Sequence, residues 1–454
     1  MSTATSHHPN SDDGGFIFPL FLEFDNRDPL FTFSVPNSIA RILDGGFAME
    51  EDQDESHLEQ THVLCGFLMF SNAYWITLLG LLVAALSTAA PIGWILYKTV
   101  IEPKQEGTTK AYLIGWGIVL PFWICCPFWL IWAFSIKNVL FIFVLGGAPA
   151  IAFFFRTLEC IYGFCPEYVT KSAKDFCFYY ATLPIAARVK AKNIDNNSKS
   201  KVGDLIPCSQ TKKIKHLATF LGLLFITGAL QSILAPHQYL SIFGMGGKNI
   251  SWYGTERFFS WQLYANSALQ AMLMQMYLAT YTEALVLTFS VTTGFEAEAV
   301  MHNPLLKSES PMEFWGKRWN TFIHTVLKNG VYKPIRKFSS SRNTAVLATF
   351  LASGIFHEYL LALVFSTGDF QPIYGASTVF FVWQAMLIGL ELFLGHRPWV
   401  RAIARSLPRT VRTTLLISSG IPLAHFFLDS YLRCDYFFTH GATALPMIVQ
   451  IKGR

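Results

Sequence analysis

The chain has few charged residues, since Asp, Glu, Lys and Arg together make up 14% of its 454 residues. Soluble domains usually carry about 25%, so this sequence cannot supply the polar surface of a water-soluble fold of its size. Hydrophobic residues make up 52%, the mean hydropathy is +0.36, and aromatic residues reach 15%, which suits contact with lipid and its interface. The composition predicts a polytopic membrane protein with an all-α fold.

Signatures of several other protein classes are absent. The eight cysteines form no paired CxxC framework, which excludes a disulfide-stapled secreted fold and leaves free thiols as our interpretation. Residues 1–72 lack a basic segment followed by a short apolar core, so no removable signal peptide is predicted. No internal repeat of about 20–50 residues is evident, which argues against a transporter. No GxSxG nucleophile elbow is present, so direct transfer is favoured over an acyl-enzyme.

Long apolar runs predict where the chain crosses a bilayer, whose core of about 30 Å requires roughly 20 apolar residues per helix. We expect about eight spans, at residues 73–97, 111–132, 139–155, 217–234, 262–292, 344–366, 376–394 and 413–428. The span 262–292 is long enough to be tilted or kinked. A polar and acidic tail, 1–72, expected to be partly disordered, and a short tail, 432–454, flank this transmembrane domain of residues 73–431.

Basic residues cluster in four connections between the predicted spans. Residues 98–110, 156–216, 294–343 and 395–412 hold 27 of the 35 Lys and Arg residues. Because Lys and Arg concentrate on the cytoplasmic side of membrane proteins, we expect these connections in the cytosol and both termini on the other side. Nucleic-acid binding is excluded, since the basic residues adjoin membrane spans and have no recognisable nucleic-acid-binding fold around them.

Ionisable side chains within the predicted spans are candidates for function, because placing them in a bilayer without partners is costly. They are Glu283, His357, Glu358, Glu391 and His425. His357 lies near the middle of its span, where a structural histidine satisfied by a hydrogen bond is as reasonable as a functional one. No second His follows four residues later, as a zinc protease motif requires, and we predict no metal site.

A second feature lies in the connection 302–337, upstream of His357. Ser310, Pro311 and Glu313 predict the start of a helix there, with Ser as the N-cap, Pro in the first position and Glu completing a capping box. The helix would carry the aromatic and basic residues that follow.

On this predicted helix Trp315 and Trp319 are four residues apart and share a face, whereas Lys317 and Arg318 point elsewhere. The aromatic face would lie against the membrane or the core. From the residues alone, an amphipathic interfacial helix that binds anionic lipid is the preferred interpretation.

The two features together resemble a known family, the wax synthase branch of the membrane-bound O-acyltransferases. The resemblance rests on the order and spacing of Asn303-Pro304-Leu305, Ser310-Pro311, Phe314-Trp315-Gly316-Lys317-Arg318-Trp319-Asn320 and, about 37 residues on, Ser353-Gly354-Ile355-Phe356-His357-Glu358. The segment from Arg156 to Glu159, with Tyr162-Gly163-Phe164, is similar to the family more weakly. The resemblance runs from about residue 140 to 430, and residues 1–72 have no counterpart in it.

The resemblance implies a multi-pass helical O-acyltransferase in which His357 is the catalytic residue and Asn320 the second functional position. It implies acyl-CoA as a co-substrate, a hydrophobic alcohol as the acceptor and no cofactor. A long-chain fatty alcohol esterified to a wax ester is the expected reaction, and the endoplasmic reticulum the expected membrane.

The chemistry of the residues agrees with these roles. A histidine has a suitable pKa to take the hydroxyl proton as oxygen attacks the thioester, and an amide such as that of Asn320 can donate to a developing oxyanion. Basic side chains can bind the phosphates of CoA. The predicted substrate-binding residues are Trp315, Lys317, Arg318, Trp319 and Glu358.

Three alternatives remain open from the sequence. The same scaffold could acylate a sterol, a diacylglycerol or a terpenoid alcohol, including with acetyl-CoA, because sequence does not give the pocket volume. A transporter would instead move a solute without acyl transfer, and a catalytically silent scaffold would tolerate the loss of His357. The sequence also leaves open the acyl chain length and whether the chain forms a homo-oligomer.

Overall fold

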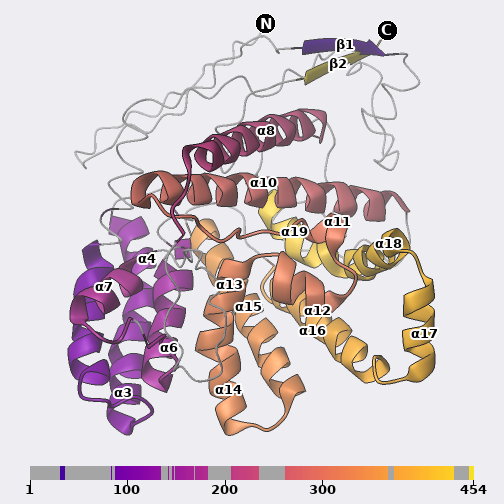
Figure 1. Cartoon of the computed structure of the whole chain (residues 1–454). Helices are drawn as coiled ribbons and strands as arrows, with labels where there is room; N and C mark the ends of the chain where they lie inside the picture. The colour runs from indigo at the N-terminus through magenta and orange to yellow at the C-terminus, as the bar shows by residue number, and fades with distance from the viewer. Residues whose placement is uncertain are drawn as a thin grey trace, which may run out of the picture.

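The computed structural model describes a largely helical chain (Figure 1). The described residues are 87–133, 149–167, 169–182, 206–234, 261–366 and 373–433, together with 31–35, 449–453 and the isolated residues 83, 142, 146 and 147. The prediction of a helical membrane protein is confirmed. By length and apolar composition, five stretches could cross a membrane: Thr109–Ala133, Gln210–Leu230, Arg342–Phe365, Ala376–Leu394 and Arg409–Tyr431.

These five stretches coincide with five of the eight predicted spans, and the count of eight is not confirmed. Of the remaining three, 73–97 and 139–155 lie partly outside the described residues. The third, 262–292, forms the 33-residue helix α10 (Trp261–Thr293) but is not among the five stretches. Its buried polar side chains explain the low hydropathy: Ser267, Gln270, Gln275, Thr280 and Ser290.

Short helices form the N-terminal part of the described fold, drawn in indigo to magenta in Figure 1. They are the π-helical turn Tyr97–Ile101, α3 (Thr109–Ile114), the π-helical turn Gly115–Val119, α4 (Leu120–Ala133), the π-helical turn Pro149–Phe154, α6 (Phe155–Tyr162) and α7 (Ala173–Ala181). The Thr108 and Ser172 side chains accept the backbone N–H of the third residue after them, which fixes the starts of α3 and α7.

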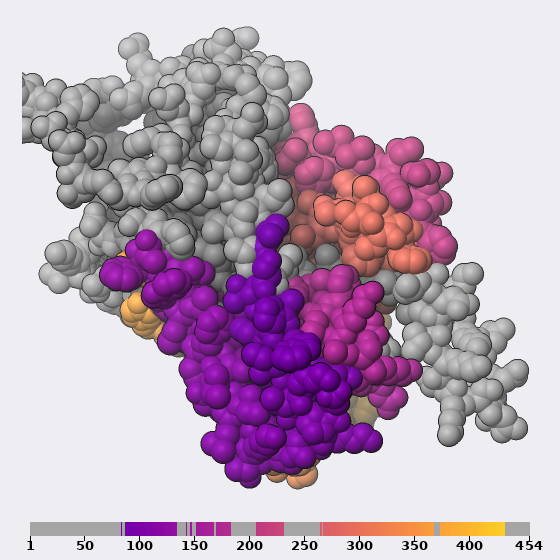
Figure 2. Space-filling model, turned by 90° about the vertical axis from the view of Figure 1, so that its left-hand side faces the viewer, coloured from indigo at the N-terminus to yellow at the C-terminus, as the bar shows by residue number. Residues whose placement is uncertain are grey.

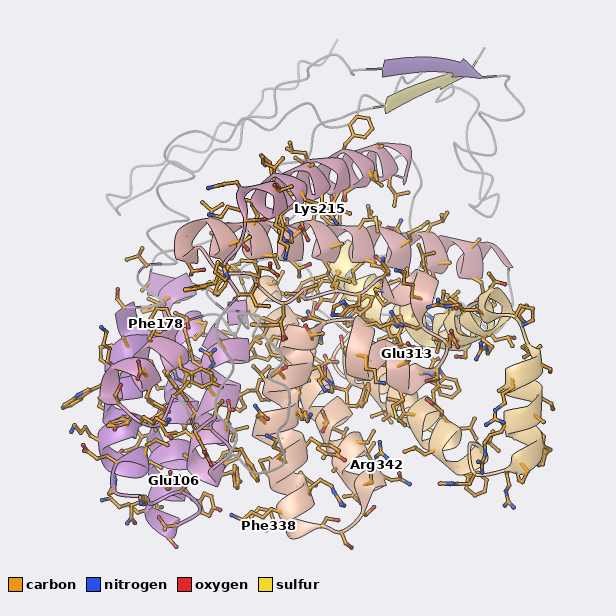
Figure 3. All side chains as sticks on the ribbon, in the orientation of Figure 1. Glu106, Phe178, Lys215, Glu313, Phe338 and Arg342 are labelled. Atoms are coloured by element: carbon orange, nitrogen blue, oxygen red, sulfur yellow. The ribbon has the colours of Figure 1, made fainter. Side chains whose placement is uncertain are left out.

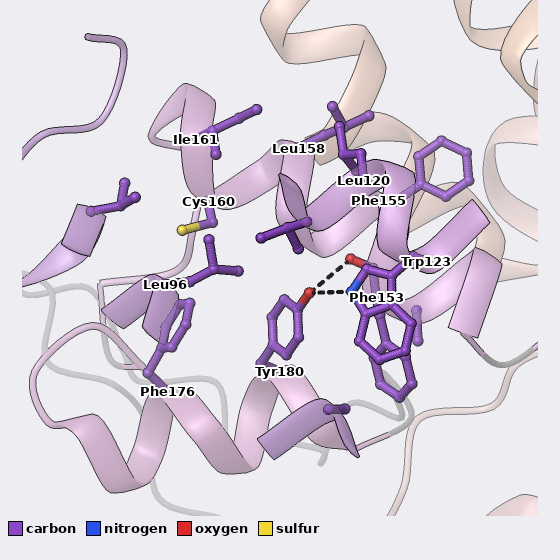
Figure 4. Close-up of a cluster of buried hydrophobic side chains, with 14 of the residues drawn as sticks. Leu96, Leu120, Trp123, Phe153, Phe155, Leu158, Cys160, Ile161, Phe176 and Tyr180 are labelled. Atoms are coloured by element: carbon purple, nitrogen blue, oxygen red, sulfur yellow. Dashed lines mark hydrogen bonds between the residues drawn. The ribbon is translucent and has the colours of Figure 1, made fainter. Parts of the chain in front are cut away.

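A buried aromatic cluster holds these short helices together (Figure 4). Trp123 Nε1 donates to Tyr180 Oη at 2.9 Å, so α4 and α7 are joined inside the apolar core. The Trp123 and Phe153 rings lie 4.6 Å apart between their centroids. Buried Trp and Tyr side chains normally find hydrogen-bond partners for their polar atoms, and this single hydrogen bond provides one for Trp123 and for Tyr180.

Two long helices lie side by side across the upper part of Figure 1, α8 (Gln210–Leu234) and α10. His216 Nδ1 on α8 is 2.5 Å from Glu283 Oε1 on α10, and the hydroxyls of Thr227 and Thr280 are 3.0 Å apart. Glu283, predicted as an intramembrane candidate, therefore pairs with a histidine at this helix contact.

The remaining helices carry the aromatic and basic segment 314–320 and His357. They are α11 (Pro304–Lys307), α12 (Pro311–Glu313), the π-helical turn Phe314–Arg318, α13 (Thr321–Leu327), the π-helical turn Lys328–Tyr332, α14 (Lys333–Phe338), α15 (Arg342–Phe365), α16 (Ala376–Leu394), α17 (Pro398–Ser406), α18 (Arg409–Gly420), the 3₁₀ turn Ile421–Leu423 and α19 (Ala424–Arg433). Helices α15 and α16 approach closely at Gly354, where an added Cβ would lie 2.7 Å from Thr378 Cα. Only glycine permits this spacing.

The connection 294–343 contains a helical arm that the sequence interpretation treated as loop. Helix α13, the π-helical turn Lys328–Tyr332 and α14 all contact α15, and Figure 1 shows the arm running beside that helix. Figure 3 shows Phe338 at the lower end of the arm, and Arg342, the first residue of α15, reaches the sulfur of Met312 with Nη2 at 3.7 Å. The arm was missed because its lysines and arginine keep its hydropathy low, and its stability comes from packing against α15 rather than from an apolar run.

The described residues also include a two-stranded ribbon. Strand β1 (Phe31–Val35) pairs in parallel with β2 (Val449–Gly453), with Phe31 opposite Val449. Both segments alternate apolar and polar residues, a period-2 pattern that suits strands. The ribbon joins the two predicted tails, which otherwise lie mostly outside the described residues.

The four basic connections are linked to one another by contacts. Gly107 N donates to Ile161 O at 2.8 Å, Asn329 Nδ2 donates to Glu159 Oε1 at 2.9 Å, and an ion pair joins the last two connections. Such contacts agree with one common side of the membrane, although the orientation itself stays a prediction.

Large apolar side chains are exposed on α3, the turn after it and α4. Leu113 and Ile118 are 67% exposed and Trp132 is 79% exposed. Figure 2 shows this segment, indigo to purple, forming the lower part of one face of the molecule. An apolar surface of this kind suits contact with lipid chains rather than water.

Candidate active site

His357 lies on α15, which begins where the Ser341 hydroxyl accepts the Thr344 backbone N–H. The imidazole is half-buried, and its Nδ1 is 2.7 Å from the hydroxyl oxygen of Tyr431 on α19. In the described part of the chain no other side chain hydrogen-bonds this ring. Within these described residues the second ring nitrogen, Nε2, has no side-chain hydrogen-bond partner.

Aromatic rings enclose the imidazole on several sides. Phe381 on α16 stacks on it with ring centroids 5.0 Å apart and an interplanar angle of 13°. Phe427 on α19 presents its edge at 4.9 Å, and Phe356 does so at 5.3 Å. Three helices thus supply a largely apolar surrounding, in which polar interactions are stronger than in water.

The aromatic and basic segment starts as the sequence predicts. Ser310 Oγ accepts the Glu313 backbone N–H at 3.2 Å, with Pro311 in the first helical position. The return bond of the capping box differs slightly, since Glu313 Oε2 accepts from the backbone N–H of Glu309 at 2.9 Å. The helix turns directly into a π-helical turn over Phe314–Arg318, a feature often found at functional sites.

Trp315 connects this segment to the surroundings of His357. Its Nε1 donates to Gln384 Oε1 on α16 at 3.1 Å, and its ring lies 5.8 Å from Phe381, the ring that stacks on His357. Trp319 packs on Trp315 at 5.6 Å, so the predicted shared face is confirmed. Residues about 40 positions apart in the sequence therefore meet at one aromatic cluster.

The two basic residues of the motif differ in their surroundings. Arg318 donates to Glu313 Oε1 through Nε at 2.8 Å and through Nη2 at 2.6 Å, and it also donates to the His302 carbonyl at 3.2 Å. Burial alone would raise the pKa of Glu313, but the Glu309 N–H and the Arg318 guanidinium outweigh it and lower the pKa. Lys317 is exposed, and within the described residues it forms no ion pair.

Asn320 has a local structural task. Its Oδ1 accepts the backbone N–H of Ile323 at 3.1 Å, which caps α13. No contact joins Asn320 to His357 among the described residues, so the second functional position implied by the resemblance stays a prediction. Its half-buried amide nitrogen is not used by the cap.

Two carboxylates of the predicted spans bind backbone N–H groups. Glu358 Oε1 accepts from Thr378 at 3.0 Å, in the first turn of α16, where the N-cap Gly375 offers no side chain. Glu391 Oε2 accepts from Met312 at 2.8 Å and so holds α12 against α16. Glu358, predicted to bind substrate, thus has a structural partner at the start of α16, and its substrate-binding role stays a prediction.

A second polar cluster lies on α6, in the segment that resembles the family more weakly. Arg156 is buried and donates to the carbonyl oxygens of Tyr179, Tyr180 and Thr182 at the end of α7. Glu159, also buried, accepts from Tyr179 Oη at 2.8 Å and from the amide of Asn329 at 2.9 Å.

This cluster fastens the helical arm to α6. Burial raises the pKa of Glu159 to about 7, although the hydrogen bonds from Tyr179 and Asn329 oppose that rise. Beside it, Gly330 approaches Phe155 so closely that an added Cβ would lie 2.8 Å from the carbonyl oxygen. Phe155 in turn touches Phe356, the neighbour of His357. The cluster therefore supports the site without entering it.

Tyr431, Phe381 and Gln384 were missed by the sequence interpretation. Gln384 carried a signal, because a polar side chain in an otherwise apolar span needs a partner. Tyr431 and Phe381 carried none, since aromatic residues are abundant throughout these spans.

The motif and the histidine fall within one segment related to known proteins. Residues 298–383 match the Membrane bound O-acyl transferase family, and they include Trp315, His357 and Phe381. This part of the chain is similar to that family. Relatives named as long-chain-alcohol O-fatty-acyltransferases support the resemblance to the wax synthase branch.

Among these relatives of the O-acyltransferase family are three proteins of Arabidopsis thaliana. Probable long-chain-alcohol O-fatty-acyltransferase 2 is 29% identical over 169 residues, which are 34% of this chain and 47% of the relative. Probable long-chain-alcohol O-fatty-acyltransferase 6 is 28% identical over 216 residues, 44% and 59% of the two chains. Acyl-CoA--sterol O-acyltransferase 1 is 33% identical over 86 residues, 18% and 24%. The chain spans about half the length of the first two relatives.

Proposed function

We propose that this protein is a membrane acyltransferase that moves a fatty acyl group from acyl-CoA to a long-chain fatty alcohol, forming a wax ester. The observation that carries the proposal is His357, an imidazole in the middle of an apolar helix with Nε2 available and with the Trp315 segment packed on the ring that stacks against it. The names of the relatives support the same reaction class.

In the proposed reaction His357 acts as a general base. Its Nε2 takes the hydroxyl proton as the alcohol oxygen bonds to the thioester carbonyl carbon. The carbon–sulfur bond then breaks, and the proton passes from Nε2 to the departing thiolate of CoA. General-base catalysis contributes about 10²–10⁴-fold, and the apolar rings around the imidazole keep water from competing as the acceptor.

The aromatic and basic segment would provide the remaining groups. The amide nitrogen of Asn320 is proposed to donate to the oxyanion, while Trp315 and Trp319 line the approach of the acyl chain. Exposed Lys317 is proposed to pair with a phosphate of CoA. Arg318 and Glu358 are proposed to position this segment and α16, because both are already bound within the fold.

A sterol is the second candidate acceptor. The relative named as an acyl-CoA--sterol O-acyltransferase supports it over a region of 86 residues. A fatty alcohol remains the first proposal, because the relatives named for that acceptor match longer regions of this chain. We also propose the endoplasmic reticulum as the location, where a hydrophobic acceptor can enter laterally from the bilayer.

The test is expression in cells that lack neutral-lipid synthesis, with fatty alcohols and sterols supplied separately and esters identified by mass spectrometry. Wax esters formed by the wild-type protein and lost in His357→Gln would support the proposal. Formation of sterol esters alone would show that the acceptor is a sterol instead of a fatty alcohol. Ester formation that persists in a well-accumulated His357→Gln protein would refute the role of His357, and transport without esters would favour a transporter.

A further inference from the structure

Tyr431 is the polar neighbour that the fold places on the imidazole. It lies on α19, is 4% exposed, and belongs to an apolar cluster with residues of α10, α15 and α19. Its hydroxyl oxygen is 2.7 Å from His357 Nδ1, within the range of a strong hydrogen bond. A buried tyrosine hydroxyl usually takes a partner, and the candidate catalytic residue is a partner of this one.

In the part of the chain that the structure describes, no carboxylate takes this place beside the ring. The neighbouring Glu358 directs Oε1 to the backbone N–H of Thr378, and the other rings around the imidazole belong to phenylalanines. Among the described residues, the hydroxyl of Tyr431 is therefore the one group that hydrogen-bonds Nδ1. Which ring nitrogen of a histidine carries the proton is set by the partner of the other nitrogen.

We propose that Tyr431 is a positioning residue that accepts the Nδ1–H of His357 and thereby holds the tautomer whose Nε2 takes the proton of the acceptor alcohol. This inference rests on the proposed function. Tyr431 itself touches neither substrate in the reaction; it acts through the imidazole. As Nε2 gains the alcohol proton, Nδ1–H continues to donate to the hydroxyl oxygen, so the imidazolium keeps its orientation until the proton leaves with the CoA thiol.

The reverse arrangement has the opposite consequence. If the tyrosine hydroxyl donated to Nδ1, the ring proton would sit on Nε2, and the histidine could not act as a base there. Removing the hydroxyl would then leave turnover unchanged or raise it. The sign of the change on removing one oxygen atom therefore separates the two arrangements.

The variant Tyr431→Phe removes this hydroxyl with little change in shape. We expect kcat for ester formation to fall about tenfold, the rate equivalent of one orienting hydrogen bond, with unchanged KM for acyl-CoA and for the alcohol. The matched control is Tyr359→Phe on α15. Its hydroxyl donates to the carbonyl of Ile124 at 3.1 Å instead of to His357, so its kcat should stay near wild type.

A double-mutant cycle provides a readout that a merely structural role would not give. In a His357→Gln background, Tyr431→Phe should have no further effect on residual turnover, because the residue acts through the imidazole. Independent losses that multiply would overturn the inference, as would wild-type kcat in Tyr431→Phe. If His357→Gln itself retains activity, the proposed function fails instead, so the two failures are distinguishable.

A second pair of variants covers the case in which Tyr431→Phe does not accumulate. Tyr431→Gln keeps an oxygen acceptor, whereas Tyr431→Met has similar length without one. Higher kcat in the Gln variant at equal protein level is the expected result. Equal kcat in the two variants would overturn the inference.

Discussion

Replacing Lys317 and Arg318 separately with Ala should separate ligand binding from loop structure. Arg318 is 22% exposed and Glu313 is 25% exposed in their ion pair, and two guanidinium N–H groups reach one carboxylate oxygen. Hydrogen bonds to charged groups contribute about 1.5–3 kcal/mol. We therefore expect Arg318→Ala to destabilise the segment by about 1–2 kcal/mol, allowing for its partial exposure.

Loss of that ion pair should lower kcat, because the same segment holds Trp315 on Gln384 and against Phe381. Lys317→Ala should behave differently. Exposed ion pairs contribute up to about 1 kcal/mol, so KM for acyl-CoA should rise by up to roughly fivefold while kcat and Tm stay unchanged. That rise should shrink at high salt, where charges are screened.

The measurements are steady-state kinetics with acyl-CoA varied at two salt concentrations, and thermal unfolding of the purified variants. The matched control is Lys337→Ala, an exposed lysine of α14. The last residue of that helix, Phe338, lies at the lower end of the arm in Figure 3. The control variant should leave KM unchanged if the effect is local rather than a result of net charge. The reasoning is refuted if both motif variants raise KM equally and leave Tm unchanged.

Three further predictions concern single side chains. His357→Gln should reduce kcat by about 10²–10⁴-fold with normal accumulation, and near-wild-type turnover would return this histidine to a structural role. Asn320→Ala should lower both turnover and stability, the latter by about 1 kcal/mol through loss of the α13 cap. Asn320→Ser can still cap the helix, so it should restore Tm but not kcat. Recovery of both Tm and kcat in the Ser variant would assign Asn320 to capping alone. The folded state favours protonated Glu159, with a pKa of about 7 against the usual 4.5. The contribution of this residue to stability should therefore be complete below about pH 4.5 and be lost as the pH rises through 7, by up to roughly 3 kcal/mol. Glu159→Gln should flatten the change of Tm between these pH values, and an unchanged slope would contradict the assignment.

Several elements were predictable because their signals are local. Apolar runs predicted α15 and α16 nearly to their ends, since the length of a bilayer-crossing helix depends mainly on local composition. The capping of the helix at Ser310 was predictable for the same reason, because the bond spans three residues. His357 stood out as an ionisable group in an apolar run.

Other elements depended on contacts between distant segments. The helical arm with α13 and α14 has no apolar run of its own and is held by α15 and by the cluster at Glu159. The long helix α10 buries polar side chains, so its composition obscured its place in the fold. The strands β1 and β2 pair although they lie near opposite ends of the sequence. Period-2 alternation predicts that a segment forms a strand, but it does not predict which segment that strand pairs with.

The sequence by itself determined that this is a helical membrane protein, placed five of its apolar helices and singled out His357 with the Trp315 segment, because composition, periodicity and motif spacing are local properties. The tertiary structure decided which groups meet. It placed Tyr431 on the imidazole, although 74 residues separate them, and bound Glu358 to the start of α16 rather than to His357. It also gave two adjacent basic residues different surroundings, since Arg318 pairs with Glu313 whereas Lys317 is exposed. Hydrogen bonds reach about 3 Å, so only the packing of α15, α16 and α19 against one another could choose these partners.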